Sequence, residues 1–191
     1  MITRARQIEI EKAIVELLEE YDLGTYPISI GKVSEALQVN LIPYSGLSNR
    51  EKTLADLASR DKSFNITSFD YMYAQVVFDD IPGSYFCRSR FSGGHEIAHI
   101  WLEHEENTPN REDEANYFSG YLLAPHPLII TTKTLNNTSE ISKCFAVSRD
   151  CASFAIDQAN ARKCEGGFWK PHEKWLIENI KWKGGDLFGR A

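Results

Sequence analysis

The sequence has no closely paired cysteines of the kind that bind a metal. Its four cysteines form no C-x-x-C pair, so a cysteine-based zinc site has no supporting spacing. The simplest interpretation is reduced thiols in a cytosolic protein, most of them buried as small apolar groups. The four residues are Cys87, Cys144, Cys151 and Cys164.

Long apolar segments and an excess of basic residues are also absent. No uninterrupted run of apolar residues approaches the length of a membrane span. The opening segment, MITRARQIEIEKAIVELLEE, is charged throughout, unlike a signal peptide. The formal net charge is −6, which does not indicate a nucleic-acid-binding surface. We therefore expect a cytoplasmic protein with neither a membrane nor a nucleic acid as its partner.

A possible metal site is present in His95-Glu96-Ile97-Ala98-His99, which has the pattern H-E-x-x-H. Helical residues four apart share a face, so His95 and His99 can bind one metal ion from the same side. Two neutral imidazoles suit zinc, although another divalent metal is not excluded. Glu96 is placed to take a proton from an attacking water. The competing interpretation of the pentapeptide alone is a surface helix without a metal.

A catalytic zinc site needs a third protein ligand, and a second helix follows with Glu112, Asp113 and Glu114 in its first turn. These acidic residues would also stabilise the helix dipole without any metal. At about 100° per residue, Glu114 lies nearest of the three to the apolar stripe of this helix. A buried carboxylate needs a partner, and a metal ion is one. We therefore predict one zinc per chain, bound by His95, His99 and Glu114, with Glu112 as the alternative third ligand.

Other polar residues near these helices have weaker functional predictions. Tyr121 shares the face of Glu114 and is a candidate to stabilise the transition state. Tyr117 and His126 are weaker candidates, and a structural role is the favoured alternative for all three. His104 points away from the metal face on the helical wheel, so we expect a solvated histidine.

The order of hydrophobic patterns predicts an α+β fold that is mostly helical, with a small β-sheet. Strands are expected at 39–44 and 71–78, and the Pro82-Gly83 turn predicts a return strand at 84–88. Helices are expected at 8–21, 30–37, 47–60, 140–162 (as a pair) and 172–181.

The helix pair at 140–162, joined near Ser148, resembles a helix-turn-helix. Its second helix is not basic overall, because Arg149 and Arg162 are offset by Asp150 and Asp157. Packing or docking is therefore favoured over DNA binding. We predict a peptidase-type domain at 1–163 and an aromatic, basic tail at 164–191.

Several motifs follow one another in a fixed order: Arg90-Phe91, the H-E-x-x-H pattern, Glu114-Ala115-Asn116-Tyr117-Phe118 and Leu122-Leu123-Ala124-Pro125. Together they resemble the ImmA/IrrE family of zinc-dependent metallopeptidases. The resemblance covers about residues 8–162, and it departs from the family at Gly93-Gly94. It implies a zincin-like fold and a narrow substrate, a helix-turn-helix repressor of a phage or mobile element.

These observations predict a zinc metalloendopeptidase that cleaves such a repressor. The alternative is a metal-containing module that relieves repression by docking the repressor without cutting it. Glu96 argues against the alternative, because a structural zinc has no use for a general base.

Overall fold

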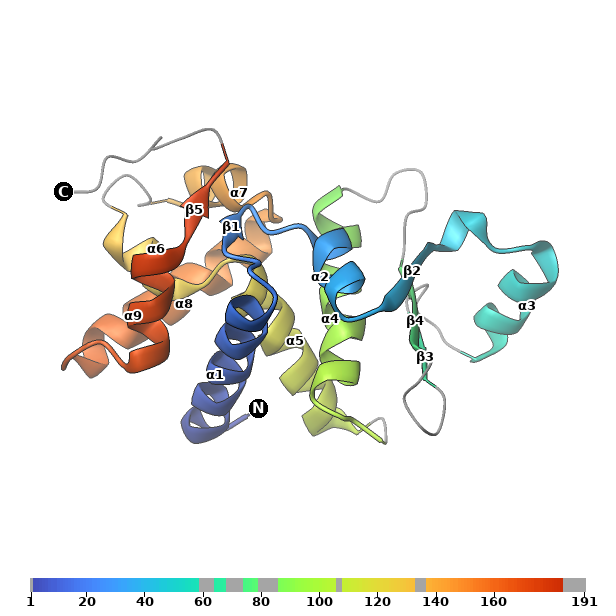
Figure 1. Cartoon of the computed structure of the whole chain (residues 1–191), viewed down its shortest axis with the longest axis horizontal. Coiled ribbons are helices and arrows are strands. Elements are labelled where there is room, and N and C mark those ends of the chain that lie inside the picture. The colour runs from blue at the N-terminus through green and yellow to red at the C-terminus, as the bar shows by residue number, and fades with distance from the viewer. Residues whose placement is uncertain are drawn as a thin grey trace. The chain divides into compact units, whose positions relative to one another are not determined.

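The computed structural model describes residues 2–58, 64–67, 74–78, 86–105, 108–132 and 137–183, and it divides into two compact units (Figure 1). Unit 1 consists of residues 30–119, and unit 2 consists of residues 2–29 and 120–191. The boundary at Ser119 and Gly120 falls inside one helix, α5 (Pro109–Leu123). These units group the residues differently from the predicted division at residue 163.

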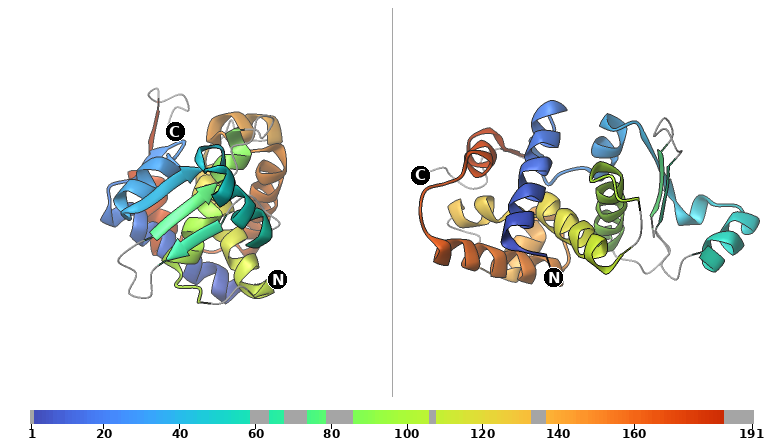
Figure 2. Two further views of the ribbon diagram at one scale, coloured as in Figure 1. Left: turned by 90° about the vertical axis from the view of Figure 1, so that its right-hand side faces the viewer. Right: turned by 90° about the horizontal axis from the view of Figure 1, so that it is seen from below.

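Unit 1 contains a three-stranded sheet in the order β2-β4-β3. The central strand β4 is parallel to β2, with Val39 opposite Ala74, and antiparallel to β3, with Phe64 opposite Val77. Helix α4 packs against β4 and β3, and Figure 2 shows it beside the sheet. The elements are α2 (Ile30–Ala36), β2 (Val39–Pro43), η1 (Tyr44–Gly46), α3 (Asn49–Ala58), β3 (Phe64–Thr67), β4 (Ala74–Phe78) and α4 (Phe86–Trp101).

The prediction of a return strand at 84–88 is wrong for residues 86–88, the part of this segment that the structure describes. Residues 86–88 form the first turn of α4, and the antiparallel partner of β4 is the earlier strand β3. The guanidinium of Arg90 lies 5.7 Å from the ring centre of Phe86, one helical turn away. This cation–π contact links residues four apart and so favours the helix over a strand. Residues 71–73 and 79–85, which the prediction also used, lie outside the described part.

Unit 2 is built mainly from helices, with one short parallel pair of strands, β1 and β5. Helix α9 packs against α1 and α6, and α8 packs against α6 and α7. Its elements are α1 (Arg4–Glu20), β1 (Thr25–Tyr26), α6 (His126–Thr131), α7 (Thr138–Phe145), α8 (Arg149–Glu165), α9 (Pro171–Asn179) and β5 (Lys181–Trp182).

The predicted helix pair corresponds to α7 and α8. Ala146 ends α7 in the left-handed conformation at φ 53°, and the side chain of Ser148 accepts from the Cys151 N–H to cap α8. The pair and its junction are therefore confirmed, while a helix-turn-helix function stays a prediction.

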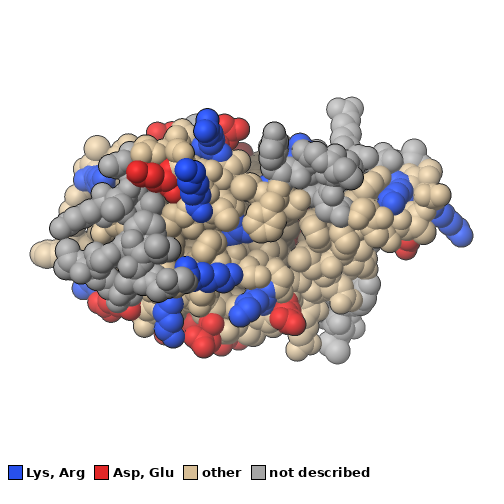
Figure 3. Space-filling view, turned by 90° about the horizontal axis from the view of Figure 1, so that it is seen from above, with Lys and Arg blue, Asp and Glu red and all other residues tan. Residues whose placement is uncertain are grey.

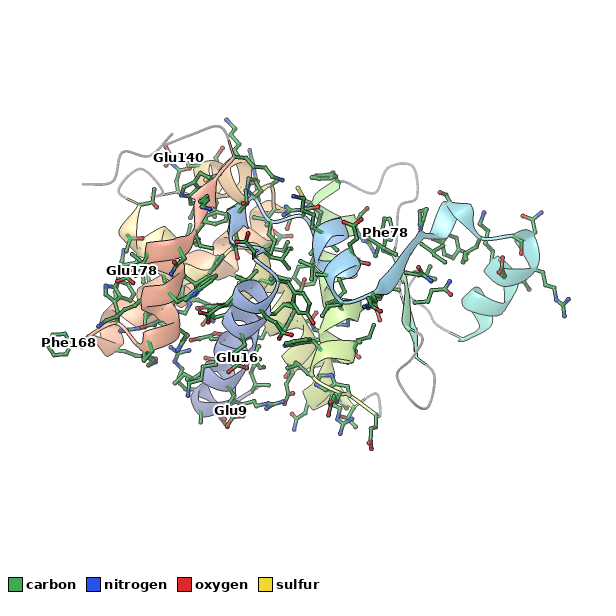
Figure 4. All side chains as sticks on the ribbon, in the orientation of Figure 1. Glu9, Glu16, Phe78, Glu140, Phe168 and Glu178 are labelled. Carbon is green, nitrogen blue, oxygen red and sulfur yellow. The ribbon has the colours of Figure 1, made fainter. Side chains whose placement is uncertain are left out.

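The tail predicted at 164–191 contributes to unit 2 through α9 and β5. Trp182 pairs with Tyr26 in the strands, and the Tyr26 hydroxyl donates to the Leu122 carbonyl at 2.8 Å. Phe168 differs, because it is 97% exposed and extends from the ribbon in Figure 4.

The described residues expose charges of both signs. On the face drawn in Figure 3, the described Lys and Arg side chains are interspersed with Asp and Glu. Among the described residues, no helix is both long and apolar enough to cross a membrane.

Candidate metal centre

Helix α4 brings the two predicted histidine ligands together within unit 1. The Nε2 atoms of His95 and His99 lie 3.1 Å apart, as expected for residues one turn apart on the same face. Glu96 lies on the same helix and is only 7% exposed. The H-E-x-x-H pattern therefore forms the helical arrangement that its spacing predicts.

Glu112, from the first turn of α5, completes a group of three donors. One carboxylate oxygen lies 3.3 Å from Nε2 of His95, and the other lies 3.3 Å from Nε2 of His99. One donor atom from each of the three residues lies within 4.8 Å of the others. Two imidazoles and one carboxylate form the donor set of many catalytic zinc sites, so these residues fit a zinc ion.

The geometry favours Glu112, the alternative, over Glu114 as the third ligand. The carboxylate of Glu114 lies 3.1 Å from Nε2 of His104. Its side chain is 15% exposed, against 38% for Glu112, so the helical wheel ranked burial correctly. Burial did not identify the metal ligand, because the polar partner of the Glu114 carboxylate is the imidazole of His104.

The prediction that His104 is solvated is wrong, because its side chain is 4% exposed. Helix α4 ends at Trp101, and Glu103 then adopts a left-handed conformation with φ 53°. The chain turns back, and the backbone N–H of His104 donates to the backbone carbonyl of His99 at 2.9 Å. The helical wheel assumed that the helix continues through residue 104, and it therefore predicted the wrong direction for the His104 side chain.

Each histidine of the centre is also held through its second ring nitrogen. Nδ1 of His95 lies 3.1 Å from Oδ1 of Asn116, and Nδ1 of His99 lies 3.0 Å from Nδ1 of His104. Sequence reasoning missed both of these contacts. The signal for Asn116 was present, because it lies one turn from Glu112 and so shares its face.

The environment of His99 favours the neutral form that binds metals. Burial, followed by charge on His95, His104 and Arg111, lowers the pKa of His99 to about 4. At neutral pH its imidazole is therefore unprotonated at one nitrogen and available as a ligand.

Tyr121 and His126 belong to unit 2, where their rings lie 5.2 Å apart at an angle of 70°. Both side chains are buried. Tyr117 is buried as well, in unit 1. The proposed role of Tyr121 in transition-state stabilisation stays a prediction.

A second group with metal-binding residue types lies in unit 2 and consists of Glu11, His126 and Glu173. Its charges are already balanced. Arg4 lies 2.5 Å from Glu11, and Arg162 donates to both oxygens of Glu173 at 2.6 and 2.9 Å. A divalent cation here would bury an uncompensated positive charge, which is costly. The group in unit 1 is therefore the better metal centre.

Comparison with protein families gives an independent line of evidence. Residues 87–157 match the Peptidase_M78 family, described as the IrrE N-terminal-like domain. Searches of curated proteins and of solved structures found no match. The matched segment includes His95, Glu96, His99, Glu112 and Glu114. The match confirms the resemblance seen in the sequence: the segment that contains the candidate metal centre is similar to this family of metallopeptidases.

Proposed function

We propose that this protein is a zinc-dependent endopeptidase whose metal is held by His95, His99 and Glu112. The observation that carries the proposal is the convergence of these three side chains, each offering one donor atom within 4.8 Å of the others. The peptidase family of residues 87–157 supports it. One zinc per chain is expected, because the competing group in unit 2 is neutralised by arginines.

The proposed chemistry assigns a separate role to Glu96. A zinc ion held at the centre would activate water and polarise a peptide carbonyl. Glu96 follows His95 directly in the chain, and its burial shields the carboxylate from bulk solvent. It is the group placed to take a proton from the attacking water and to return it to the leaving amine.

The proposed substrate is a helix-turn-helix repressor of a phage or mobile element. The resemblance to the ImmA/IrrE family supports this choice, and the narrow specificity it implies suits a regulatory protease. A protein that only docks the repressor would need no general base, so the buried Glu96 favours cleavage over docking.

Replacement of Glu96 by Gln tests cleavage directly. Gln keeps the shape of Glu but cannot accept the proton, so zinc content should be retained while the cleavage rate falls by about 10²–10⁴-fold. Each form is coexpressed with a candidate helix-turn-helix repressor from a neighbouring reading frame, and repressor length and reporter output are measured together.

The exposed Glu105, which follows the end of α4, provides a control. Glu105→Gln should cleave like the wild type. If Glu96→Gln relieves repression fully and the repressor stays intact with every form, the protein acts by docking and the peptidase proposal is wrong.

A further inference from the structure

His104 lies between one histidine of the candidate metal centre and the carboxylate of Glu114. Its Nδ1 is 3.0 Å from Nδ1 of His99, and its Nε2 is 3.1 Å from Oε2 of Glu114. The rings of His99 and His104 meet at 74°, with centres 5.0 Å apart. We call this chain of contacts the Glu114–His104–His99 relay.

With Glu114 ionised and His104 neutral, hydrogen-bond chemistry gives the relay a single direction. An ionised carboxylate only accepts, so Nε2 of His104 must carry the hydrogen that faces Glu114. In a neutral imidazole the other nitrogen is then an acceptor, so Nδ1 of His104 faces His99 with a lone pair. The hydrogen between the two Nδ1 atoms therefore belongs to His99.

This direction determines which nitrogen of His99 can bind a metal. With its hydrogen on Nδ1, His99 has a lone pair on Nε2, the atom that lies 3.3 Å from Glu112. The opposite tautomer would set two lone pairs against each other at 3.0 Å from His104. The relay thus favours the form of His99 whose free nitrogen faces the other two donors.

We propose that His104 and Glu114 are positioning residues that fix the tautomer and ring orientation of His99 for metal binding. This inference rests on the proposed function, because it takes His99 as a ligand. Hydrogen bonds of this kind to the second nitrogen of a ligating histidine typically contribute about 10–100-fold in metal affinity or activity. Glu114 thereby acquires a role at the centre without touching the metal.

Three replacements of His104 separate positioning from simple packing. Asn offers an oxygen close to the position of Nδ1 and can still accept from His99. Gln places its amide nearer to Nε2 and faces Glu114 instead. Leu fills space without any polar atom. A packing role predicts that Asn and Gln behave alike, whereas the relay predicts that Asn is clearly better.

The measurement is the affinity of the purified full-length chain for Zn²⁺, by competition with a chromophoric chelator, and the visible spectrum with Co²⁺ alone. His104→Leu should bind zinc about 10–100-fold more weakly than the wild type. His104→Asn should recover part of that loss, and His104→Gln should not. Glu103→Gln, an exposed neighbour, is the control and should bind like the wild type.

The outcomes also separate this inference from the proposed function. If His99→Ala loses zinc while His104→Leu binds as tightly as the wild type, the relay is wrong and the metal centre stands. If His99→Ala also keeps its zinc, the metal centre itself is wrong. Should His104→Leu fail to fold, the Asn and Gln variants decide, and equal affinities for those two overturn the relay.

Discussion

At the scale of single residues, the choice between two glutamates two positions apart determines how the metal centre is assembled. Glu112 is the more exposed of the two, yet its oxygens lie 3.3 Å from both histidine nitrogens. Glu114 is the more buried, and it contacts His104. Helical periodicity reports how deeply a side chain is buried, but it does not report which polar group meets that side chain.

The first prediction is that Glu112→Ala lowers zinc affinity more than Glu114→Ala does. Loss of a ligand removes a direct bond, so the effect should exceed the roughly 10–100-fold cost of losing a residue behind a ligand. Zinc affinity of the two purified variants, measured by chelator competition, checks this order.

Asp113→Ala is the matched control, because it removes a carboxylate from the same helical turn that is not one of the three donors. It should bind zinc like the wild type. A larger loss for Glu114→Ala than for Glu112→Ala would restore the sequence-based assignment of the third ligand.

At the scale of helices and strands, two glycines in α4 permit neighbouring side chains to approach this helix closely. A Cβ atom at Gly94 would lie 2.8 Å from the Ser119 hydroxyl oxygen, and one at Gly93 would lie 3.0 Å from a methyl of Ile30. The Ser119 hydroxyl cannot move without cost, because it is buried and donates to the Phe91 carbonyl at 2.8 Å. The departure from the family at Gly93-Gly94 therefore has a packing reason in this chain.

A second prediction follows for Gly94→Ala. Within a helix, Ala is normally favoured over Gly by about 1 kcal/mol. Here the clash with Ser119 should reverse that sign and destabilise the protein by about 1–3 kcal/mol, the usual cost of overpacking. Chemical denaturation followed by circular dichroism measures the difference.

Ser119→Ala removes the clashing oxygen and leaves a contact of 3.5 Å to the Cβ of residue 119. The double variant Gly94→Ala/Ser119→Ala should therefore be at least as stable as Ser119→Ala alone. If the Gly94→Ala penalty is the same in both backgrounds, the Ser119 hydroxyl is not its cause.

Much of the element order could be predicted from the sequence, and the exceptions have physical reasons. Periodicity indicated α1, α8 and α9, and a four-residue spacing placed His95 beside His99. The prediction of a return strand at 84–88 failed because nothing in that short segment shows that the partner of β4 comes earlier in the chain. His104 was misplaced because a left-handed residue, Glu103, ends the helical geometry on which the wheel relies.

At the scale of the whole molecule, unit 1 contains the candidate metal centre and unit 2 contains a buried ionic network. The network joins three helices of unit 2, because Arg162 of α8 pairs with Glu173 of α9, and His172 of α9 contacts Glu11 of α1 at 3.0 Å. Its members are buried, so each charge depends on its partner.

The pKa of Glu173 indicates how this network responds to acid. Burial alone would raise the pKa of Glu173, but hydrogen bonds from Arg162 and the Lys170 N–H, with the His126 imidazole 3.7 Å away, outweigh burial and hold the pKa below its usual range. A carboxyl whose pKa is lowered by folding stabilises the protein fully above its unfolded pKa of about 4.3. That stabilisation is lost as the pH falls from there through the lower pKa of the folded state.

The last prediction concerns Glu173→Gln, which leaves the buried Arg162 without its counter-charge. Near pH 7 the free energy of unfolding should fall by up to the ~3–5 kcal/mol that breaking a buried ion pair costs. Below about pH 4 the gap between wild type and variant should narrow, because the unfolded wild type then binds a proton at this carboxyl that the folded state binds only at lower pH. Urea denaturation across this pH range measures the gap. Glu178→Gln, on the exposed side of the same helix (Figure 4), should stay within about 0.5 kcal/mol of the wild type at every pH. A gap for Glu173→Gln that keeps its size down to the acid limit would show that the carboxylate charge is not what stabilises the network.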